Sequence, residues 1–330
     1  MTRPRVAVAA LGGTISIAPG GSLEDDAVPR LSTADLLGEL GADLPMEVTA
    51  GTLAGLASAS MSYAKLAQTR QWGIEQIEAG AVGLVVVQGT DTLEETAYFF
   101  ELTWPFDEPV VVTGAMRNPS LLSPDGPANL LAALTVAADP RSRGRGALVA
   151  FNDDVHAARW VRKAHSSHLE AFSSAPAGPL GMVVEQAVHY FHRPAPRPPA
   201  LPAGQVEGLV PVLESGLGDS GELLSLVLNS GARGVVLAAT GVGHVSAGTA
   251  DVVRSAEVPI VVATRTGAGP TFRATYGSHG SESSLIRMGA TMAGWLCPRK
   301  SRALLQLLLA AGVPRAEIEQ QFRLRGDLDR

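Results

Sequence analysis

The segment that most constrains the fold is an apolar run, residues 83–87, followed by a polar turn and a helical pattern over residues 92–102. A short apolar run of this kind predicts a buried strand. Thr90 and Asp91 therefore lie side by side between the C-terminal end of a strand and the N-terminus of a helix. In an open α/β sheet, ligands bind at that position. The hydroxyl and the carboxylate are consequently candidate site residues.

Asp91 has a simpler alternative role. Together with Glu94 it matches a capping box, in which two side chains satisfy the free N–H groups at a helix start. Capping accounts for one carboxylate. It leaves unexplained the hydroxyls on both sides of Asp91 and the glycine, Gly89, that brings the backbone close.

Strand patterns alternate with helical patterns along the first half of the chain. Such alternation predicts an α/β fold with a mostly parallel sheet and right-handed crossovers. A Gly/Pro-rich loop is expected at residues 18–29, before a short helix that Ser32 or Thr33 caps. The expected strands are residues 5–10, 46–53, 83–87, 109–113 and 146–151. The longer helices are residues 61–79, which Ser60 precedes, 92–102 and 128–138.

A proline-rich segment predicts the domain boundary. A chain of 330 residues exceeds a usual single core, so two domains are expected. Residues 193–205 contain closely spaced prolines and predict an extended linker. We therefore expect a larger N-terminal domain at residues 1–192 and a smaller C-terminal α/β domain at residues 206–330. Its expected elements are strands at 208–213, 234–239 and 258–264 and an apolar helix at 301–311.

Composition excludes several classes of protein. The net charge of −6, with no basic cluster, argues against a nucleic-acid partner. No apolar run is long enough to span a membrane, and residues 6–11 are too short for a signal-peptide core of roughly 7–15 residues. The single cysteine, Cys297, excludes an internal disulfide. We expect a cytoplasmic protein without membrane association.

The end of the first predicted strand carries a candidate nucleophile. Gly12 and Gly13 let the backbone approach a ligand closely, and their N–H groups can stabilise an oxyanion. The hydroxyl of Thr14 follows them directly and is the candidate nucleophile. The alternative is that the two glycines form only a turn.

Lys163 is a candidate proton acceptor. A hydroxyl is a poor nucleophile near neutral pH unless a base takes its proton, and burial favours the neutral form of a lysine that can do so. Of the 26 basic residues only three are lysines, so a retained lysine can mark a position where arginine cannot serve. The alternative is a surface cation beside Arg159 and Arg162.

Other chemical signatures are incomplete. His165 and His168 can share one helical face, but no carboxylate or cysteine set completes a metal site. Residues 241–243 follow a strand as a dinucleotide-binding turn would, yet Ser246 stands where the third glycine belongs. Neither a serine nucleophile elbow nor a Walker A sequence occurs. No metal or organic cofactor is expected.

Five segments, in order, resemble the bacterial-type L-asparaginase family of amidohydrolases, and the two-domain layout is similar as well. Gln88 stands where many members carry histidine. The matching segments are residues 11–15, 88–97, 112–130, 151–163 and 171–181.

The resemblance implies an amidohydrolase that converts L-asparagine to L-aspartate and ammonia through a threonine acyl-enzyme. Thr14 would be the nucleophile, while Thr90, Asp91 and Lys163 would assist proton transfer and bind substrate. The family needs no metal or organic cofactor.

Further residues are implied in substrate binding. Ser58 matches the serine that holds the α-carboxylate of the substrate, and Asp91 is placed to hold its α-amino group. Gly13, Thr90 and Ala115 complete the expected binding set.

The family also implies a homo-oligomer, a dimer or a tetramer, with each site at an interface between subunits. His244, Tyr276 and Glu282 are the candidates for the polar groups that a neighbouring subunit would contribute.

Two departures from the family pattern bear on activity. Residues 16–30 lack the tyrosine that the family carries in the loop after the first motif, so another group activates Thr14, the loop closes differently, or activity is low. Ala59 replaces a glutamine that holds the α-amino group, which implies weaker substrate affinity.

Two alternative functions remain open. The first is a catalytically weak protein that binds or senses asparagine. The second is the ammonia-generating subunit of a tRNA amidotransferase, which would need a nucleic-acid-binding module that this acidic chain has no room for before Gly12.

Overall fold

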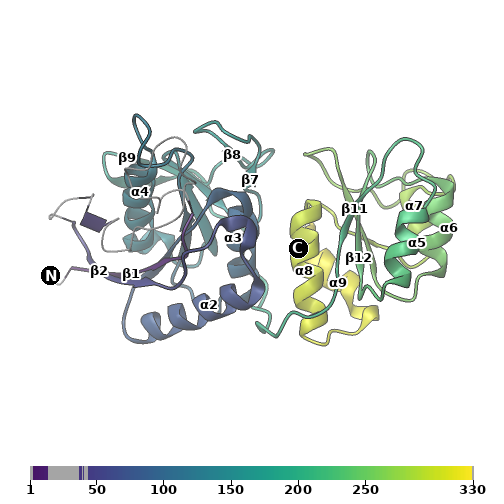
Figure 1. The fold of residues 1–330 in the computed structure, drawn as a ribbon, viewed down its shortest axis with the longest axis horizontal. Coiled ribbons are helices and arrows are strands. Elements are labelled where there is room, and N and C mark those ends of the chain that lie inside the picture. Colours follow the sequence, from purple (N-terminus) through teal and green to yellow (C-terminus); the bar gives the residue numbers. More distant parts are fainter. Residues whose placement is uncertain (1–2, 14–36, 39, 41–43, 329–330) are drawn as a thin grey trace. The chain divides into compact units, whose positions relative to one another are not determined.

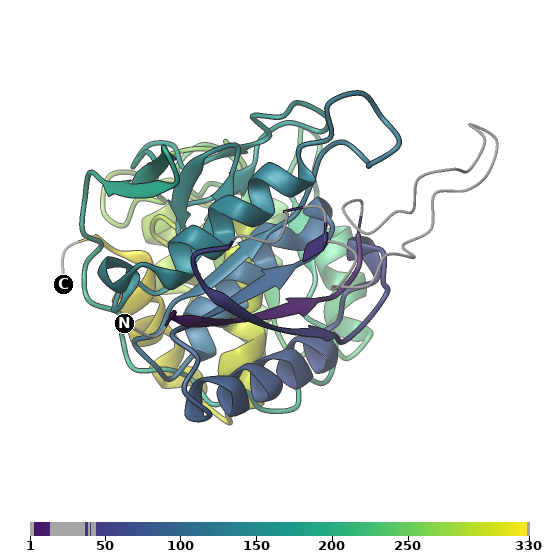
Figure 2. The ribbon, with the colours of Figure 1, turned by 90° about the vertical axis from the view of Figure 1, so that its left-hand side faces the viewer.

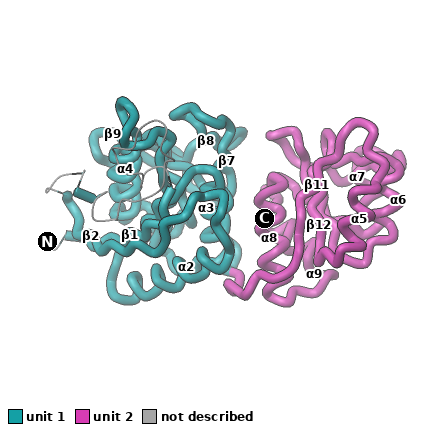
Figure 3. Tube along the Cα trace, in the orientation of Figure 1, with its two compact units in different colours: residues 1–200 teal, residues 201–330 magenta. Residues whose placement is uncertain are grey.

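The computed structural model describes residues 3–13, 37–38, 40 and 44–328. The chain divides into two compact units, residues 1–200 and 201–330 (Figure 3). Each unit is built on its own sheet with flanking helices, and the larger, mostly parallel sheet belongs to unit 1. The predicted two-domain α/β fold is confirmed. The expected loop at 18–29 and the helix start at Ser32 or Thr33 lie outside the described residues.

An eight-stranded sheet forms the centre of unit 1, in the order β10-β9-β6-β5-β4-β3-β1-β2 (Figure 1). Strands β2, β1, β3, β4 and β5 are parallel neighbours, whereas the pairs β5–β6, β6–β9 and β9–β10 are antiparallel. The bounds are β1 (Arg5–Ala10), β2 (Glu47–Thr52), β3 (Gly83–Val87), β4 (Val110–Thr113), β5 (Ala147–Phe151), β6 (Asp154–Ala157), β9 (Gly181–Val184) and β10 (Ala187–Tyr190).

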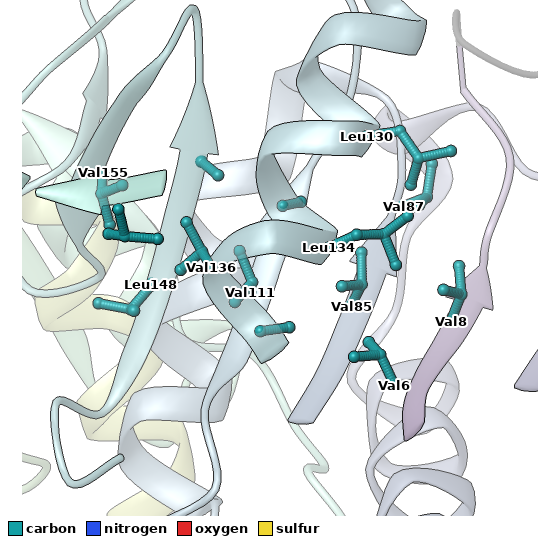
Figure 4. Close-up of a cluster of buried hydrophobic side chains, with 14 of the residues drawn as sticks. Val6, Val8, Val85, Val87, Val111, Leu130, Leu134, Val136, Leu148 and Val155 are labelled. Carbon is teal, nitrogen blue, oxygen red and sulfur yellow. The ribbon is translucent and has the colours of Figure 1, made fainter. Parts of the chain in front are cut away.

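Helix α4 (Gly126–Ala138) covers one face of this sheet. Alternate residues of the strands point toward it, as a strand's two-residue repeat requires, and meet Leu130 and Leu134 (Figure 4). Each such side chain contributes about 1.5–3 kcal/mol on full burial. The strand residues in this cluster include Val6, Val8, Val85, Val87, Val111 and Leu148.

Helix α2 (Tyr63–Glu78) covers the opposite face, and α3 (Leu93–Thr103) follows the turn after β3. Leu84, which alternates with Val85, lies against Gly73 of α2 beside the ring of Trp104. Figure 2 shows α2 and α4 on opposite sides of the strands. The part of unit 1 that the structure describes also contains the 3-10 turns η2 (Ser58–Ser60), η3 (Thr90–Thr92) and η4 (Pro140–Ser142).

The strand order defines where a ligand can bind. The chain passes from β1 to β2 on one side and then to β3 on the other side of β1, which makes a topological switch point between β1 and β3. At such a point the connections leave in opposite directions and open a crevice beyond the carboxyl ends of the strands. Gly12–Gly13 and Gly89–Asp91 follow those two strand ends.

A separate two-stranded ladder, β7 (Arg162–Lys163) with β8 (Phe172–Ser173), lies outside the eight-stranded sheet. Lys163 pairs with Phe172 in its antiparallel register. The ring of Phe172 is buried and lies 4.7 Å from that of Phe151 at the end of β5. The ladder is thus attached to the main sheet through an aromatic pair.

Unit 2 contains a four-stranded parallel sheet in the order β11-β12-β13-β14. Its first strand is shorter than the expected residues 208–213, because Gly208 is left-handed (φ 81°) and Pro211 lacks the N–H that a ladder needs. None of the helices in the described ranges is long and apolar enough to cross a membrane. The bounds are β11 (Val212–Glu214), β12 (Val235–Ala239), β13 (Ile260–Thr264), β14 (Thr291–Met292), α5 (Glu222–Asn229), α6 (Ala247–Ser255), α7 (Glu282–Arg287), α8 (Pro298–Ala310) and α9 (Arg315–Gly326).

The contact between β3 and α4 can be tested at Gly83. A Cβ there would lie 2.5 Å from the backbone oxygen of Ala137, so Gly83→Ala must push the helix away and is expected to cost about 1–3 kcal/mol of unfolding free energy. Gly55→Ala is the matched control, because nothing lies within 4 Å of a Cβ at that position. The free energy of unfolding of both variants is measured by chemical denaturation. Equal stability of the two would contradict this packing.

Candidate active site

The turns that follow β1 and β3 touch each other. Gly12 (φ 108°) and Gly13 (φ 89°) are both buried and left-handed, a conformation that glycine adopts without strain. A Cβ on Gly13 would lie 2.0 Å from the backbone N of Gly89, so only glycine fits. Gly13 is therefore packed directly against the turn that carries Thr90 and Asp91. Thr14, the predicted nucleophile, lies outside the described residues.

Lys163 joins Thr90 and Asp91. Its Nζ donates to Thr90 Oγ1 and to Asp91 Oδ1, at 2.8 Å each. Thr90 is buried, the Lys163 side chain is 16% exposed, and the Asp91 side chain is 64% exposed. The structure thus brings together three predicted residues from two segments of the chain. Lys163 is not the surface cation of the alternative reading.

Asp91 is held in its ionised form. The hydrogen bond from Lys163 lowers the pKa of Asp91 and outweighs the effect of partial burial, and a hydrogen bond from Ser58 adds to the lowering. An exposed carboxylate that stays ionised can accept hydrogen bonds from a ligand's ammonium group. Its two oxygens serve different neighbours, Lys163 at Oδ1 and Ser58 at Oδ2.

Ser58 lies against Asp91, and its role in holding a substrate stays a prediction. Its hydroxyl donates to Asp91 Oδ2 at 3.3 Å and accepts from the Asp91 backbone N–H at 3.2 Å. The Thr92 hydroxyl donates to the Ser58 carbonyl at 2.8 Å, and the buried Gln88 amide donates to Thr92 at 3.4 Å. These bonds couple the 3-10 turn at Ser58 to the turn after β3.

Ala115 is buried at the end of β4, in a turn held by polar side chains. Asp125 accepts from the backbone N–H groups of Met116 at 2.9 Å and Arg117 at 2.8 Å. The Asn129 side-chain amide donates to the Gly114 carbonyl and to Asp125, at 3.0 Å each. The turn therefore has a defined backbone position at the same sheet edge as Gly13 and Thr90.

The predicted capping box of Asp91 and Glu94 is wrong. The N-cap of α3 is Thr92, which makes no side-chain capping bond. The Asp91 carboxylate is already engaged by Lys163 and Ser58. Glu94 Oε2 instead accepts the backbone N–H of Lys163 at 2.5 Å.

His244, Tyr276 and Glu282 form a cluster within unit 2. His244 Nε2 lies 3.0 Å from Glu282 Oε2, and the rings of His244 and Tyr276 meet edge-on at 4.9 Å. Burial raises the pKa of Glu282, but hydrogen bonds from the backbone N–H groups of Tyr276 and Thr275, with His244, hold it below its usual value. The three candidates thus lie together; their role toward a neighbouring subunit stays a prediction.

No metal site is formed by the described residues, among which no group of three or more His, Cys, Asp or Glu side chains is arranged to hold an ion. The rings of His165 and His168 are stacked, 3.6 Å apart. His165 Nδ1 accepts the backbone N–H groups of Ser167 at 3.1 Å and His168 at 3.0 Å, which gives this pair a local structural role.

Sequence reasoning missed the residues that support the site. Thr92 and Asp125 lie in recognisable motifs, but local spacing did not indicate their contacts. Thr92 binds the Ser58 carbonyl 34 residues away, and Asp125 binds backbone N–H groups eight and nine residues before it. The sequence contains one signal for Glu94, which is a charged residue on the apolar side of a helix start. The structure shows that this residue is only 2% exposed.

The titration of Asp91 tests the Lys163 contact. Lys163→Met removes the main cause of the lowered pKa, so the pKa of Asp91 should rise toward the ordinary value of an aspartate. Because the folded pKa is depressed, the stabilisation is present above the unfolded pKa and is lost as pH falls through the folded value. Because Asp91 is exposed to solvent, this stabilisation is small. Carboxyl NMR of both proteins makes the measurement; an unshifted titration would contradict the ion pair.

Comparison with known proteins agrees with this geometry. Residues 5–196 match the model for the asparaginase N-terminal domain, and residues 209–322 match the model for the glutaminase/asparaginase C-terminal domain. The chain is 38% identical to a probable L-asparaginase of Deinococcus radiodurans over 97% of both chains. It is 34% identical to L-asparaginase 2 of Escherichia coli over 73% of this chain and 70% of that one.

The fold also matches a solved structure. The crystal structure of a probable cytoplasmic L-asparaginase from Campylobacter jejuni superposes with a TM-score of 0.84 at 29% identity, covering 97% of this chain and 99% of that one. Both units are thus represented in the same order in a solved relative. The chain belongs to the asparaginase family of amidohydrolases.

Proposed function

We propose that this protein is an L-asparaginase that hydrolyses the side-chain amide of L-asparagine to L-aspartate and ammonia. The observation that carries the proposal is the position of Lys163 Nζ, 2.8 Å from both Thr90 Oγ1 and Asp91 Oδ1 at the switch point of the sheet. The names of the Deinococcus and Escherichia relatives support the choice of substrate.

In the proposed reaction, the Thr14 hydroxyl attacks the amide carbon of the substrate. Its proton leaves to a base, the amide nitrogen departs as ammonia after gaining a proton, and an acyl-enzyme ester remains on Thr14. Water then attacks the ester and releases L-aspartate. The close packing of Gly13 on Gly89 supports this assignment, because it brings the residue before Thr14 against the Thr90 turn.

Lys163 and Thr90 form the proposed proton-transfer group. When its amine is neutral, Lys163 can take a proton from the Thr90 hydroxyl across their 2.8 Å contact, and Thr90 can in turn take one from an attacking water. Asp91 orients the amine from the other side. The burial of Thr90 limits competition from bulk water.

Ser58 and Asp91 are the proposed anchors of the amino-acid end. The ionised Asp91 carboxylate suits the α-ammonium group, and the Ser58 hydroxyl can turn from its long 3.3 Å bond with Asp91 toward the α-carboxylate. Gly13, Thr90 and Ala115 would contribute to the same pocket. Assembly as a dimer or tetramer and a cytoplasmic location stay predictions.

The substrate and the nucleophile are tested together by measuring ammonia release. The wild type is expected to release ammonia from L-asparagine and little from L-glutamine, whereas Thr14→Ala abolishes turnover because no hydroxyl remains to form the ester. Thr14→Ser, which keeps a hydroxyl, is the matched control. Full turnover by Thr14→Ala would reject this nucleophile, and asparagine binding by calorimetry without ammonia release would identify a sensor instead.

The role of Lys163 is tested by Lys163→Met, which keeps the side-chain length and removes the amine. The turnover number should fall by roughly 10²–10⁴-fold, and the pH–rate profile should change, because the proton acceptor is gone. Lys65→Met is the control, since Lys65 Nζ bonds Gln68 on α2 and the carbonyl of Leu53, directly after β2, and neither is a proposed site residue. A wild-type pH–rate profile in Lys163→Met would exclude proton transfer by this residue.

A further inference from the structure

The amine of Lys163 is placed by a strand that is itself weakly supported. β7 contains only Arg162 and Lys163 and pairs with the two-residue strand β8, outside the eight-stranded sheet. A lysine amine is carried on a flexible four-carbon stem, so its position depends on where the backbone is held. A separate contact must therefore fix the backbone of Lys163 relative to Thr90.

Glu94 makes that contact. It lies in the first turn of α3, is 2% exposed, and accepts the backbone N–H of Lys163 through Oε2 at 2.5 Å. A buried carboxyl group on an otherwise apolar helix face is costly unless it is hydrogen-bonded. The backbone N–H of Lys163 is therefore a partner that the buried Glu94 carboxyl group needs.

Three residues of one short segment, residues 90–94, hold Lys163 at both ends. Thr90 and Asp91 bind the amine, and Glu94, at the start of the next helix, binds the backbone N–H. Because all three belong to one rigid turn and helix start after β3, the distance from Nζ to Thr90 does not depend on the β7–β8 ladder alone. Phe172 on Phe151 holds the other strand of that ladder.

We propose that Glu94 is a positioning residue for the proton-transfer group: it acts through the backbone of Lys163 and not on the substrate. This inference rests on the proposed function. Loss of the contact should displace the amine, and a misplacement of about 1 Å in a reacting group can cost roughly 10²-fold in rate. The effect should appear chiefly in the turnover number, because the displaced amine is the proposed proton acceptor. Asp91, which also binds that amine, keeps its hydrogen bond from Ser58.

The first experiment compares substitutions at two adjacent glutamates. Glu94→Met keeps side-chain length without an acceptor and should lower kcat by up to roughly 10²-fold with little change in KM. Glu94→Gln keeps an acceptor oxygen and should restore most of the loss. Glu95→Met and Glu95→Gln, in the same helical turn, should leave kcat at the wild-type value. Should Glu94→Met fail to fold, Glu94→Asp, which shortens the reach, replaces it.

The second experiment is a double-mutant cycle with Lys163→Met. If Glu94 acts only by placing Lys163, the double variant loses no more activity than Lys163→Met alone, because the amine it positions is already absent. Multiplicative losses, or a fall in melting temperature with unchanged kcat in Glu94→Met, would overturn the inference while leaving the proposed function intact.

A crystal structure of Glu94→Met separates the two proposals. We expect Lys163 Nζ in this variant to lie beyond hydrogen-bond distance of Thr90 Oγ1. This expected displacement does not depend on which substrate the enzyme uses. An undisplaced amine overturns the inference. Absence of ammonia release by the wild type overturns the proposed function and leaves this structural test standing.

Discussion

The contact between Gly13 and Gly89 is the constraint on which the geometry of the site depends. Both residues leave the ends of neighbouring parallel strands, about 4.8 Å apart, and their backbones meet without a side chain between them. A Cβ at Gly13 would separate the ends of β1 and β3. Thr90 and Asp91 lie one and two residues beyond Gly89, so the same contact fixes the proton-transfer group against the turn that precedes Thr14.

The site combines a rigid edge with an attached ladder. Strands β3 and β4 are fully buried between helices, β1 is buried from Val6 onward, and all three present their terminal turns at one edge of the sheet. Lys163 instead comes from the two-residue strand β7, held by hydrogen bonds to the segment after β3 and by the aromatic pair under β8. The Lys163 amine is thus positioned by polar contacts, whereas the strand end that carries Thr90 is positioned by apolar packing.

Local patterns were sufficient for the parallel strands β1 to β5 and the helices α2 to α4 of unit 1, but they predicted none of the strands β6 to β10. The bounds of β1 and β3 agree with the expected strands, because a short apolar run between turns has few other stable arrangements in a layered fold. The prediction of a capping box was wrong because a distant residue binds both side chains. Spacing shows which backbone N–H groups Asp91 and Glu94 can reach along the chain, but not that Lys163, distant in sequence, competes for both side chains.

The sequence by itself determined the α/β class, the strand ends that bear Gly13, Thr90 and Asp91, and the family, because these depend on periodicity and on ordered motifs. The family resemblance grouped Lys163 with Thr90 and Asp91, but only the tertiary structure decided their contacts. It also decided that Thr92 holds Ser58 and that Glu94 binds the Lys163 backbone. The physical reason is that hydrogen bonds between distant segments depend on strand order and close packing, which no local pattern encodes.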